Sequence, residues 1–234
     1  SNPHVVKGNA GSPYAITDYY DVDPDIAVDV SQRMKEFEQL VQRTHACGMK
    51  VVLDFVPNHV ARQYRSLAKP KGVEDLGQTD DKGMFFSPNN NFYYITGKSF
   101  SPSVDMGEGD DKYVEYPAKA TGNDCFHECP GGNDWFETVK LNYGVDPWNG
   151  SKHFSPIPST WTKMCDILLF WAAKGVDAFR CDMVHMVPVE FWHWAIAKVK
   201  EQYPDVVFIA ELYDVGIYHS YIHYGGFDYL YDKV

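Results

Sequence analysis

The sequence contains no uninterrupted run of 18 apolar residues, and its basic residues are outnumbered by its acidic ones. The first absence argues against a membrane-spanning helix, which needs about 20 mostly apolar residues. The second argues against nucleic acid and anionic membranes as partners, because 21 Lys and Arg face 32 Asp and Glu and the formal net charge is −11. A neutral ligand such as a sugar is compatible with this charge. No signal peptide, internal repeat or low-complexity segment is evident.

Cysteine is scarce, and the five present are an odd number, so they cannot all pair with one another. Cys125 and Cys129 lie in the loop-like segment "CFHECP", where a local disulfide and a metal site with His127 both stay open on weak evidence. The other three lie inside helix or strand patterns and are interpreted as small buried hydrophobic residues: Cys47, Cys165 and Cys181.

Aromatic residues, in contrast, are abundant at 15% of the chain, and hydrophobic residues make up 44%. A chain of 234 residues with this content can bury a sizeable core, as one large domain or two small ones. The rings fit two interpretations equally well, a well-packed core and a surface that binds ring-shaped ligands.

Helix patterns followed by apolar strand patterns recur along the chain. This order predicts an α/β architecture with a parallel sheet. The strand at 49–59 is an almost continuous apolar run, which is typical of a strand buried on both faces. The expected helices are 31–48, 159–175 and 188–203, and the expected strands are 49–59, 176–182, 206–212 and 226–232.

The spacing of acidic residues at the strand ends predicts both a barrel repeat and an insertion. Asp182 and Glu211 are 29 residues apart, which matches one repeat of an eight-fold barrel of about 250 residues. Asp54 and Asp182 are 128 residues apart, which is about 97 too many for one repeat. The surplus falls in 60–158, which holds 11 of the 18 glycines and is predicted to be an inserted subdomain of short strands and loops.

An unusual strand end occurs in "GVDAFRCDM", where the apolar "VDAF" runs into Arg180 and then Asp182. Side chains alternate between the two faces of a strand, so these two point the same way. Side by side, a cation and a carboxylate make either a structural ion pair or half of an active site.

Polar side chains follow three consecutive strand patterns. In parallel α/β folds such groups gather at one mouth, and neighbouring strands lie about 4.8 Å apart. Carboxylates on adjacent strands can then approach the roughly 5–5.5 Å that a retaining glycosidase requires. The residues concerned are Asp54, Asn58 and His59 on the first strand, Arg180 and Asp182 on the second, and Glu211 on the third.

Their neighbours suggest different roles for the two carboxyl groups. Arg180 is expected to lower the pKa of Asp182 and keep it ionised, as a nucleophile requires. Glu211 follows an apolar run without an adjacent cation, so burial is expected to raise its pKa and suit it to general acid work. Helix capping, a structural ion pair and a Mg²⁺ site stay open as alternatives, although Arg180 counts against the metal.

Four segments resemble the α-amylase family (family 13 glycoside hydrolases). "DFVPNH" is similar to its first characteristic segment, "AFRCD" to the second with the nucleophile, and "FIAEL" to the third with the acid/base. "SPYAITDYY" resembles the loop after the second strand. The resemblance implies a partial TIM-type (β/α)8 barrel, from about strand 3 to strand 6, with a B-type subdomain inserted after strand 3. The implied division is 1–59 and 159–234 as barrel parts and 60–158 as the B-like insertion.

The resemblance also implies a role for each catalytic position. Asp182 is the expected nucleophile and Glu211 the expected acid/base, while Arg180 orients Asp182 and Asp54 supports Arg180. The chemistry of the family requires no cofactor. The implied reaction is hydrolysis of α-glucans such as starch or maltodextrin through a covalent glycosyl-enzyme, with an oligo- or polysaccharide as the partner molecule.

Substrate and metal contacts follow from the same resemblance. His59 is expected to hydrogen-bond the sugar in subsite −1, and Tyr14 to stack on it. Asn58 stands where some members bind a structural Ca²⁺, so it is a candidate calcium ligand. The second segment often ends in Lys-His, whereas this chain has His185 and Met186 there. His185 therefore becomes the candidate contact, and substrate preference is left open.

Within the insertion, two further sets of residues are weighed. Trp135 and Tyr143 either line the cleft or pack structurally. Asp105, Asp110 and Asp111 either join the calcium site or belong to a solvated loop.

The family's fourth segment, which carries a third acidic residue, is absent from these 234 residues. We therefore expect this chain to be a fragment that lacks full activity by itself. Three other functions stay open: a transglycosylase or maltosyltransferase of the same family, an inert sugar-binding relative, and a metal-dependent lyase or isomerase. The compartment is equally open between cytoplasm, periplasm and the cell exterior.

Overall fold

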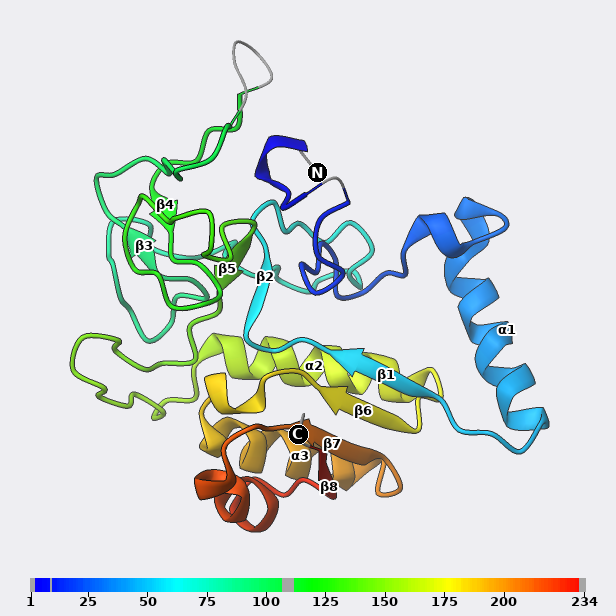
Figure 1. Ribbon diagram of the computed structural model, residues 1–234. Coiled ribbons are helices and arrows are strands. Elements are labelled where there is room, and N and C mark those ends of the chain that lie inside the picture. Colours follow the sequence, from blue (N-terminus) through cyan, green and yellow to red (C-terminus); the bar gives the residue numbers. More distant parts are fainter. Residues whose placement is uncertain (1–2, 9, 107–111, 232–234) are drawn as a thin grey trace. The chain divides into compact units, whose positions relative to one another are not determined.

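The computed structural model describes residues 3–8, 10–106 and 112–231 of the chain (Figure 1). The chain divides into two compact units, which are described separately. The first, here called the loop unit, comprises Ser1–Thr17, Asn58–Arg65 and Glu74–Thr162. The second, here called the sheet unit, comprises Asp18–Pro57, Ser66–Val73 and Lys163–Val234.

A four-stranded parallel sheet forms the centre of the sheet unit, with the strand order β1-β6-β7-β8 (Figure 1). The register aligns Asp54 with Arg180, and Arg180 with Ile209. The parallel sheet predicted from the alternation of helix and strand patterns is therefore confirmed. The strands are β1 (Val52–Phe55), β6 (Ala178–Cys181), β7 (Val207–Glu211) and β8 (Tyr229–Tyr231).

Three α-helices alternate with these strands, as the apolar periodicity predicts. Their bounds are α1 (Arg33–Ala46), α2 (Ser159–Ala173) and α3 (Val189–Gln202). Gly175 allows the sharp turn from α2 into β6, because its φ of +89° is strained for any residue with a Cβ. Trp192 of α3 packs edge-on against Phe55 of β1, with ring centroids 6.2 Å apart. None of the helices in the described part of the chain has the length and apolar character needed to cross a bilayer.

Apolar side chains that are completely buried fill the core of the sheet unit. Phe179 of β6 and Phe208 of β7 are both 0% exposed, and their rings lie 5.6 Å apart across adjacent strands. Cross-strand pairs of this kind stabilise a sheet and fix its register. The register in turn determines which polar side chains meet at the strand ends.

The loop unit consists mainly of turns joined by two short antiparallel ladders. β2 (His59–Ala61) pairs with β5 (Thr138–Lys140), and β3 (Tyr94–Ile95) pairs with β4 (Ala118–Lys119). Short helical turns complete the described secondary structure of the chain: Pro3–Val5, Pro24–Ile26, Val30–Gln32, Val184–Met186, Val215–Ile217 and a π-type turn at Ser220–Tyr224.

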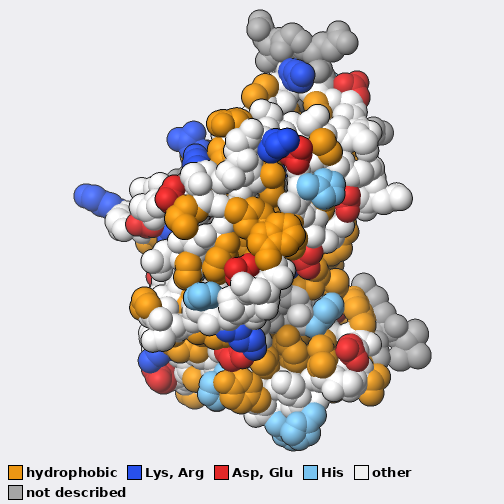
Figure 2. Space-filling view, turned by 90° about the vertical axis from the view of Figure 1, so that its left-hand side faces the viewer, with side chains coloured by type: hydrophobic (Ala, Val, Ile, Leu, Met, Phe, Trp, Pro, Cys, Tyr) orange, Lys and Arg blue, Asp and Glu red, His pale blue; other side chains and the backbone are white. Residues whose placement is uncertain are grey.

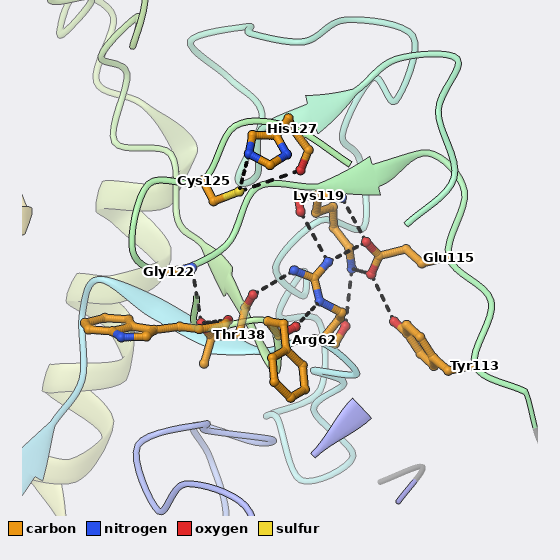
Figure 3. A network of polar contacts seen from close by, with 10 residues as sticks. Arg62, Tyr113, Glu115, Lys119, Gly122, Cys125, His127 and Thr138 are labelled. Atoms are coloured by element: carbon orange, nitrogen blue, oxygen red, sulfur yellow. Dashed lines mark hydrogen bonds and ion pairs between the residues drawn. The ribbon is translucent and has the colours of Figure 1, made fainter. Parts of the chain in front are cut away.

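A buried ion network replaces part of the apolar core in the loop unit (Figure 3). Nη1 of Arg62 lies 2.6 Å from Oε1 of Glu115, and its other nitrogens donate to backbone carbonyls, including that of Thr138 at 3.0 Å. Lys119 and Tyr113 contact the second Glu115 oxygen at 3.3 and 2.9 Å. Every strand here is short and offers few ladder hydrogen bonds. The ion network supplies further contacts that hold the loops in place.

One expected strand differs from the structure. The run 49–59 forms two separate strands, β1 and β2, which Pro57 separates because it lacks a backbone N–H. The expectation of burial on both faces is wrong for β1: Val52 is 52% exposed, and in the described chain β1 pairs with β6 alone. An apolar run reports the character of its residues but not the position of the strand in the sheet.

Replacing Phe208 by Ala tests the core of the sheet unit. We expect a loss of about 3–5 kcal/mol in the free energy of unfolding, since a fully buried ring leaves a cavity between β7 and its neighbours. Urea titration followed by circular dichroism measures this loss. As a control, Val215→Ala at a position 72% exposed should change the same quantity by less than about 0.5 kcal/mol. Equal effects of the two substitutions would contradict the packing described.

Candidate active site in the sheet unit

Arg180 is the centre of a cluster of charged side chains at the strand ends of the sheet unit. Its Nη1 donates to Oδ1 of Asp54 at 2.9 Å and to Oδ1 of Asp182 at 2.9 Å. Its Nη2 lies 2.8 Å from Oε2 of Glu211, and its Nε donates to the hydroxyl of Tyr231 at 2.7 Å. One guanidinium therefore contacts three carboxylates and a phenol.

The strand register explains why these residues meet. Asp54 of β1 and Arg180 of β6 are direct register partners, and so are Glu211 of β7 and Tyr231 of β8. Asp182 follows β6 immediately, and its backbone N–H extends the ladder by donating to the carbonyl of Phe55 at 2.8 Å. The alternation of side chains then turns Arg180 and Asp182 to the same face, as expected from their spacing.

Glu211 has more hydrogen-bond donors around it than its sequence neighbours suggest. Besides Nη2 of Arg180, the backbone N–H of Met183 donates to Oε2 at 3.1 Å, and the hydroxyl of Tyr213 donates to Oε1. The expectation that Glu211 lacks an adjacent cation is therefore wrong. The cation comes from the neighbouring strand, which a reading along one strand cannot detect.

The two central carboxyl groups are buried and interact with each other. Glu211 is 1% exposed and Asp182 is 6% exposed. Burial, then a hydrogen bond to Glu211 and its negative charge, raise the pKa of Asp182 to about 7, although Arg180 acts in the opposite direction. The expectation that Arg180 keeps the pKa of Asp182 low is therefore wrong in direction.

The hydrogen bonds indicate where the shared proton lies in this state. Glu211 accepts from Arg180, Met183 and Tyr213, and donors of this kind stabilise an ionised carboxylate. In the hydrogen bond between the two carboxyl groups, Asp182 is thus the one that carries the proton and donates it to Glu211. Two adjacent buried carboxylates do not both ionise readily, so the pair holds a proton below the raised pKa of Asp182, which is about 7.

Arg180 stays charged despite its burial. Burial lowers its pKa, but the hydrogen bonds to Asp54 and Tyr231 and the charges of Asp54 and Glu211 raise it more, and the net change is upward. Tyr231 also places its ring 5.6 Å from the guanidinium carbon. The guanidinium is therefore a permanent positive charge in the cluster.

Two tyrosines of the cluster were missed in the sequence. Tyr213 lies two residues after Glu211, so the same alternation that pairs Arg180 with Asp182 puts it within reach of Glu211. Tyr231 could be found only through the register of β8 with β7. His185 follows β6 in a short helical turn, and its ring lies 6.2 Å from that of Tyr213.

The expected sugar-binding residues of the loop unit lie close to one another. His59 is 3% exposed, contacts the backbone of Tyr14, and lies edge-on to Trp135 with ring centroids 5.3 Å apart. Burial, together with the positive charge of Lys140, lowers the pKa of His59 to about 4. Its imidazole is therefore neutral at neutral pH, and its Nδ1 lies 3.2 Å from Nδ2 of Asn58. The Tyr14 side chain is 39% exposed, so its ring face is partly open.

The candidate calcium ligand Asn58 already binds another cation. Its Oδ1 accepts a hydrogen bond from Nζ of Lys140 at 2.5 Å. A Ca²⁺ ion needs six to eight oxygen ligands, and an ammonium group directly at one of them repels it. The residues around Asn58 therefore do not fit a calcium ion. Asp110 and Asp111, expected as further calcium ligands or as part of a solvated loop, lie outside the described residues.

The other candidate residues of the loop unit have structural contacts. Cys125 and Cys129 are free thiols. Sγ of Cys125 lies 3.3 Å from Nε2 of His127 (Figure 3). The backbone N–H of Cys129 donates to Nδ1 of the same ring. Within the described ranges, no group of three or more His, Cys, Asp or Glu is arranged to hold a metal. Tyr143 is 2% exposed and packs in the interior, where its carbonyl accepts from the indole of Trp161.

The surface charge matches the acidic composition. On the face shown in Figure 2, Lys and Arg side chains are scattered singly among acidic and apolar ones. The full sequence carries a formal net charge of −11.

Comparison with known proteins gives a family match over more than half of the chain. The model of the α-amylase catalytic domain matches residues 3–140. An α-1,4-glucan:maltose-1-phosphate maltosyltransferase from Cereibacter sphaeroides is 46% identical over 93 residues, which is 37% of this chain and 16% of that protein. The matched segment is thus a small part of this curated relative.

Solved structures cover more of the chain. An α-amylase from Lactobacillus plantarum is 26% identical, with a TM-score of 0.54 over 91% of this chain and 35% of its own. A noncanonic maltogenic α-amylase from Thermotoga neapolitana is 24% identical, with a TM-score of 0.53 over 97% of this chain and 37% of its own, and supports the fold alone. The chain therefore spans little more than a third of each of these two solved chains.

The raised pKa of Asp182 predicts a specific dependence of stability on pH. An Asp whose pKa rises from about 4 unfolded to about 7 folded binds more protons in the folded state within that window, so stability falls as pH rises through it. The free energy of unfolding, measured by urea titration at several pH values, should fall more steeply for the wild type than for Asp182→Asn between these limits.

Asp177 offers a matched control of opposite sign. Although burial raises its pKa, hydrogen bonds from Lys50, the backbone of Val51 and His45 lower it to about 2. The stability that Asp177 contributes is therefore present above pH 4 and lost as pH falls towards 2, so Asp177→Asn should reduce the rise of stability between pH 2 and 4. A slope unaffected by Asp182→Asn would contradict the raised pKa.

Proposed function

Because the chain belongs to the α-amylase family, we propose that it carries the nucleophile and the acid/base of a retaining glycosidase that acts on α-glucans. The observation that carries this proposal is the buried Asp182–Glu211 pair, with one guanidinium in contact with both carboxyl groups. The activity proposed is that of a full-length protein containing this segment, with an oligo- or polysaccharide as substrate.

The proton count of the pair suits double displacement. In the first step Glu211 gives a proton to the glycosidic oxygen, that oxygen leaves with the bonding electrons, and a carboxylate oxygen of Asp182 bonds to the anomeric carbon. In the second step water attacks the same carbon, its proton returns to Glu211, and Asp182 leaves. The reaction needs the proton on Glu211, so the proton must first cross the hydrogen bond from Asp182.

Arg180 supports this chemistry as a fixed charge that orients both groups. Its contact with Asp182 stabilises the carboxylate that attacks, and its contact with Glu211 stabilises the carboxylate that forms when the proton is given up. Asp54 holds the guanidinium from β1 through contacts at 2.9 and 3.1 Å. The same guanidinium argues against the metal-dependent lyase or isomerase, because it occupies the position between carboxylates that a Mg²⁺ ion would need.

The substrate-binding roles belong to the same proposal. His59 hydrogen-bonds the sugar at the cleaved linkage, Tyr14 stacks on it, and His185 is a further contact. The neutral imidazole of His59 supports the first role, and the partly exposed ring of Tyr14 supports the second. We further propose that residues 60–158 are the family's B-type subdomain and that β1, β6, β7 and β8 are strands 3 to 6 of its barrel.

Maltosyl transfer is a second candidate within the same chemistry. The curated relative from Cereibacter sphaeroides is named for it, and its 46% identity over 93 residues exceeds the identities to the solved amylases reported above. A transferase uses the same two carboxyl groups, but a sugar hydroxyl replaces water in the second step. An inert sugar-binding relative is less well supported, because Asp182, Glu211 and Arg180 are all retained and in contact.

A covalent trap tests the nucleophile. The full-length protein is treated with a slow fluorinated α-maltosyl fluoride, and its peptides are mapped by mass spectrometry. We expect a sugar adduct on Asp182, because fluoride leaves without acid assistance and the fluorinated ester resists hydrolysis. Glu211→Gln should still form the adduct while losing about 10²–10⁴-fold of its activity on starch.

The matched control is Asp182→Asn, which keeps the shape of the side chain but provides no carboxylate. It should form no adduct. If the folded wild type forms none either, while a known amylase reacts with the same reagent, the glycosidase proposal is wrong. An adduct on another carboxyl group would reassign the nucleophile but keep the reaction class.

Product analysis separates hydrolysis from transfer. The full-length protein is given maltose 1-phosphate with a maltooligosaccharide acceptor, and products are resolved by chromatography. For the transferase we expect release of phosphate and acceptors lengthened by maltosyl units, without free maltose. Starch breakdown to free maltose or glucose, with maltose 1-phosphate left intact, would support the hydrolase instead.

A further inference from the structure

A lysine ammonium is buried between oxygen ligands in the loop unit. Nζ of Lys140 lies 2.5 Å from Oδ1 of Asn58 and 2.8 Å from Oδ1 of Asp124. The Lys140 side chain is 9% exposed and Asn58 is fully buried. A buried positive charge is costly unless it is paired and hydrogen-bonded, and these two oxygens supply both kinds of partner.

The orientation of the Asn58 amide follows from its other contact. Its Nδ2 donates to the backbone carbonyl of Gly122 at 2.7 Å. A carbonyl can only accept, so the amide nitrogen must face Gly122 and the amide oxygen must face Lys140. The oxygen is thus directed at a cation, as the oxygen of a metal ligand would be.

The backbone around Gly122 lies too close to β2 and β5 for any other residue. Its N–H donates to Oγ1 of Thr138 at 3.1 Å, as seen in Figure 3. A Cβ built at Gly122 would lie 2.6 Å from that Oγ1 and 2.9 Å from Cβ of His59. The loop that contains Gly122 and Asp124 is therefore packed against both strands. The ion pair between Lys140 and Asp124 also joins this loop to β5.

We propose that the Lys140 ammonium takes the place of the structural calcium ion that some members of the family bind at Asn58. It links three segments: Asn58 at the start of β2, Asp124 in the loop, and β5, which carries Lys140 itself. Burial lowers the pKa of Lys140, and the charge of Asp124 opposes this change, as expected of an ion pair inside a protein. In this proposal the Lys140 side chain supplies the loop unit with the cation that some family members bind as a calcium ion. This inference concerns stability and does not depend on the proposed reaction.

The calcium dependence of thermal unfolding, measured on the full-length protein, tests the proposal. We expect the melting temperature to agree within about 1 °C between millimolar CaCl₂ and EDTA, because the Lys140 ammonium already binds the Asn58 oxygen that the ion would need. Lys140→Met keeps the length of the side chain but removes its charge and donors. It should lower the melting temperature by about 5 °C, because Asn58 and Asp124 lose their partner.

Lys98→Met is the matched control, since Lys98 is 61% exposed and lies 3.5 Å from Glu128 in an exposed ion pair. It should change the melting temperature by less than about 1 °C. Equal melting temperatures for Lys140→Met and the wild type would overturn the proposal. So would a calcium-induced rise of about 5 °C in the wild type that Asn58→Ala abolishes. If Lys140→Met fails to fold, the wild-type and Asn58→Ala melts still decide between an internal cation and a bound one.

Discussion

The contact of one guanidinium with three carboxylates is the constraint on which the candidate site depends. Without Arg180, Asp54, Asp182 and Glu211 would be three acidic groups at adjacent strand ends, and burying the last two would be unfavourable. With it, the carboxyl groups can approach one another inside the sheet unit. The strand register is part of the same constraint, because a slip by one residue would turn Arg180 to the opposite face.

This constraint also explains the electrostatics of the pair. Burial and the neighbouring Glu211 raise the pKa of Asp182 to about 7, and the single fixed cation does not offset this rise, so the pair holds one proton below that pH. A nucleophile and an acid need that same proton count between them. Arg180 also contacts both members, so it stabilises the negative charge wherever it lies while the proton moves from one to the other.

Sequence reasoning succeeded where the decisive contacts lie along one element. Alternation along a strand put Arg180 beside Asp182, and apolar periodicity found all three helices and the parallel order. It failed where contacts run between elements. The cation next to Glu211 comes from β6, the hydrogen bond of Tyr231 depends on the register of β8, and Lys140 reaches Asn58 across a ladder of the loop unit. Residue types and spacing do not encode these pairings, since register is fixed by packing of both strands.

Each unit is thus organised around positive charge that the chain itself provides. In the sheet unit Arg180 contacts both groups proposed to react. Because its charge is permanent, these contacts can persist while a proton moves between the two carboxyl groups. In the loop unit Lys140 is bound by Asn58 and Asp124 and fastens strands that are too short to hold their loops by backbone bonds alone. A chain with 11 excess negative charges would otherwise attract cations from solution. In both units the cation beside the carboxylates is instead a side chain of the protein itself.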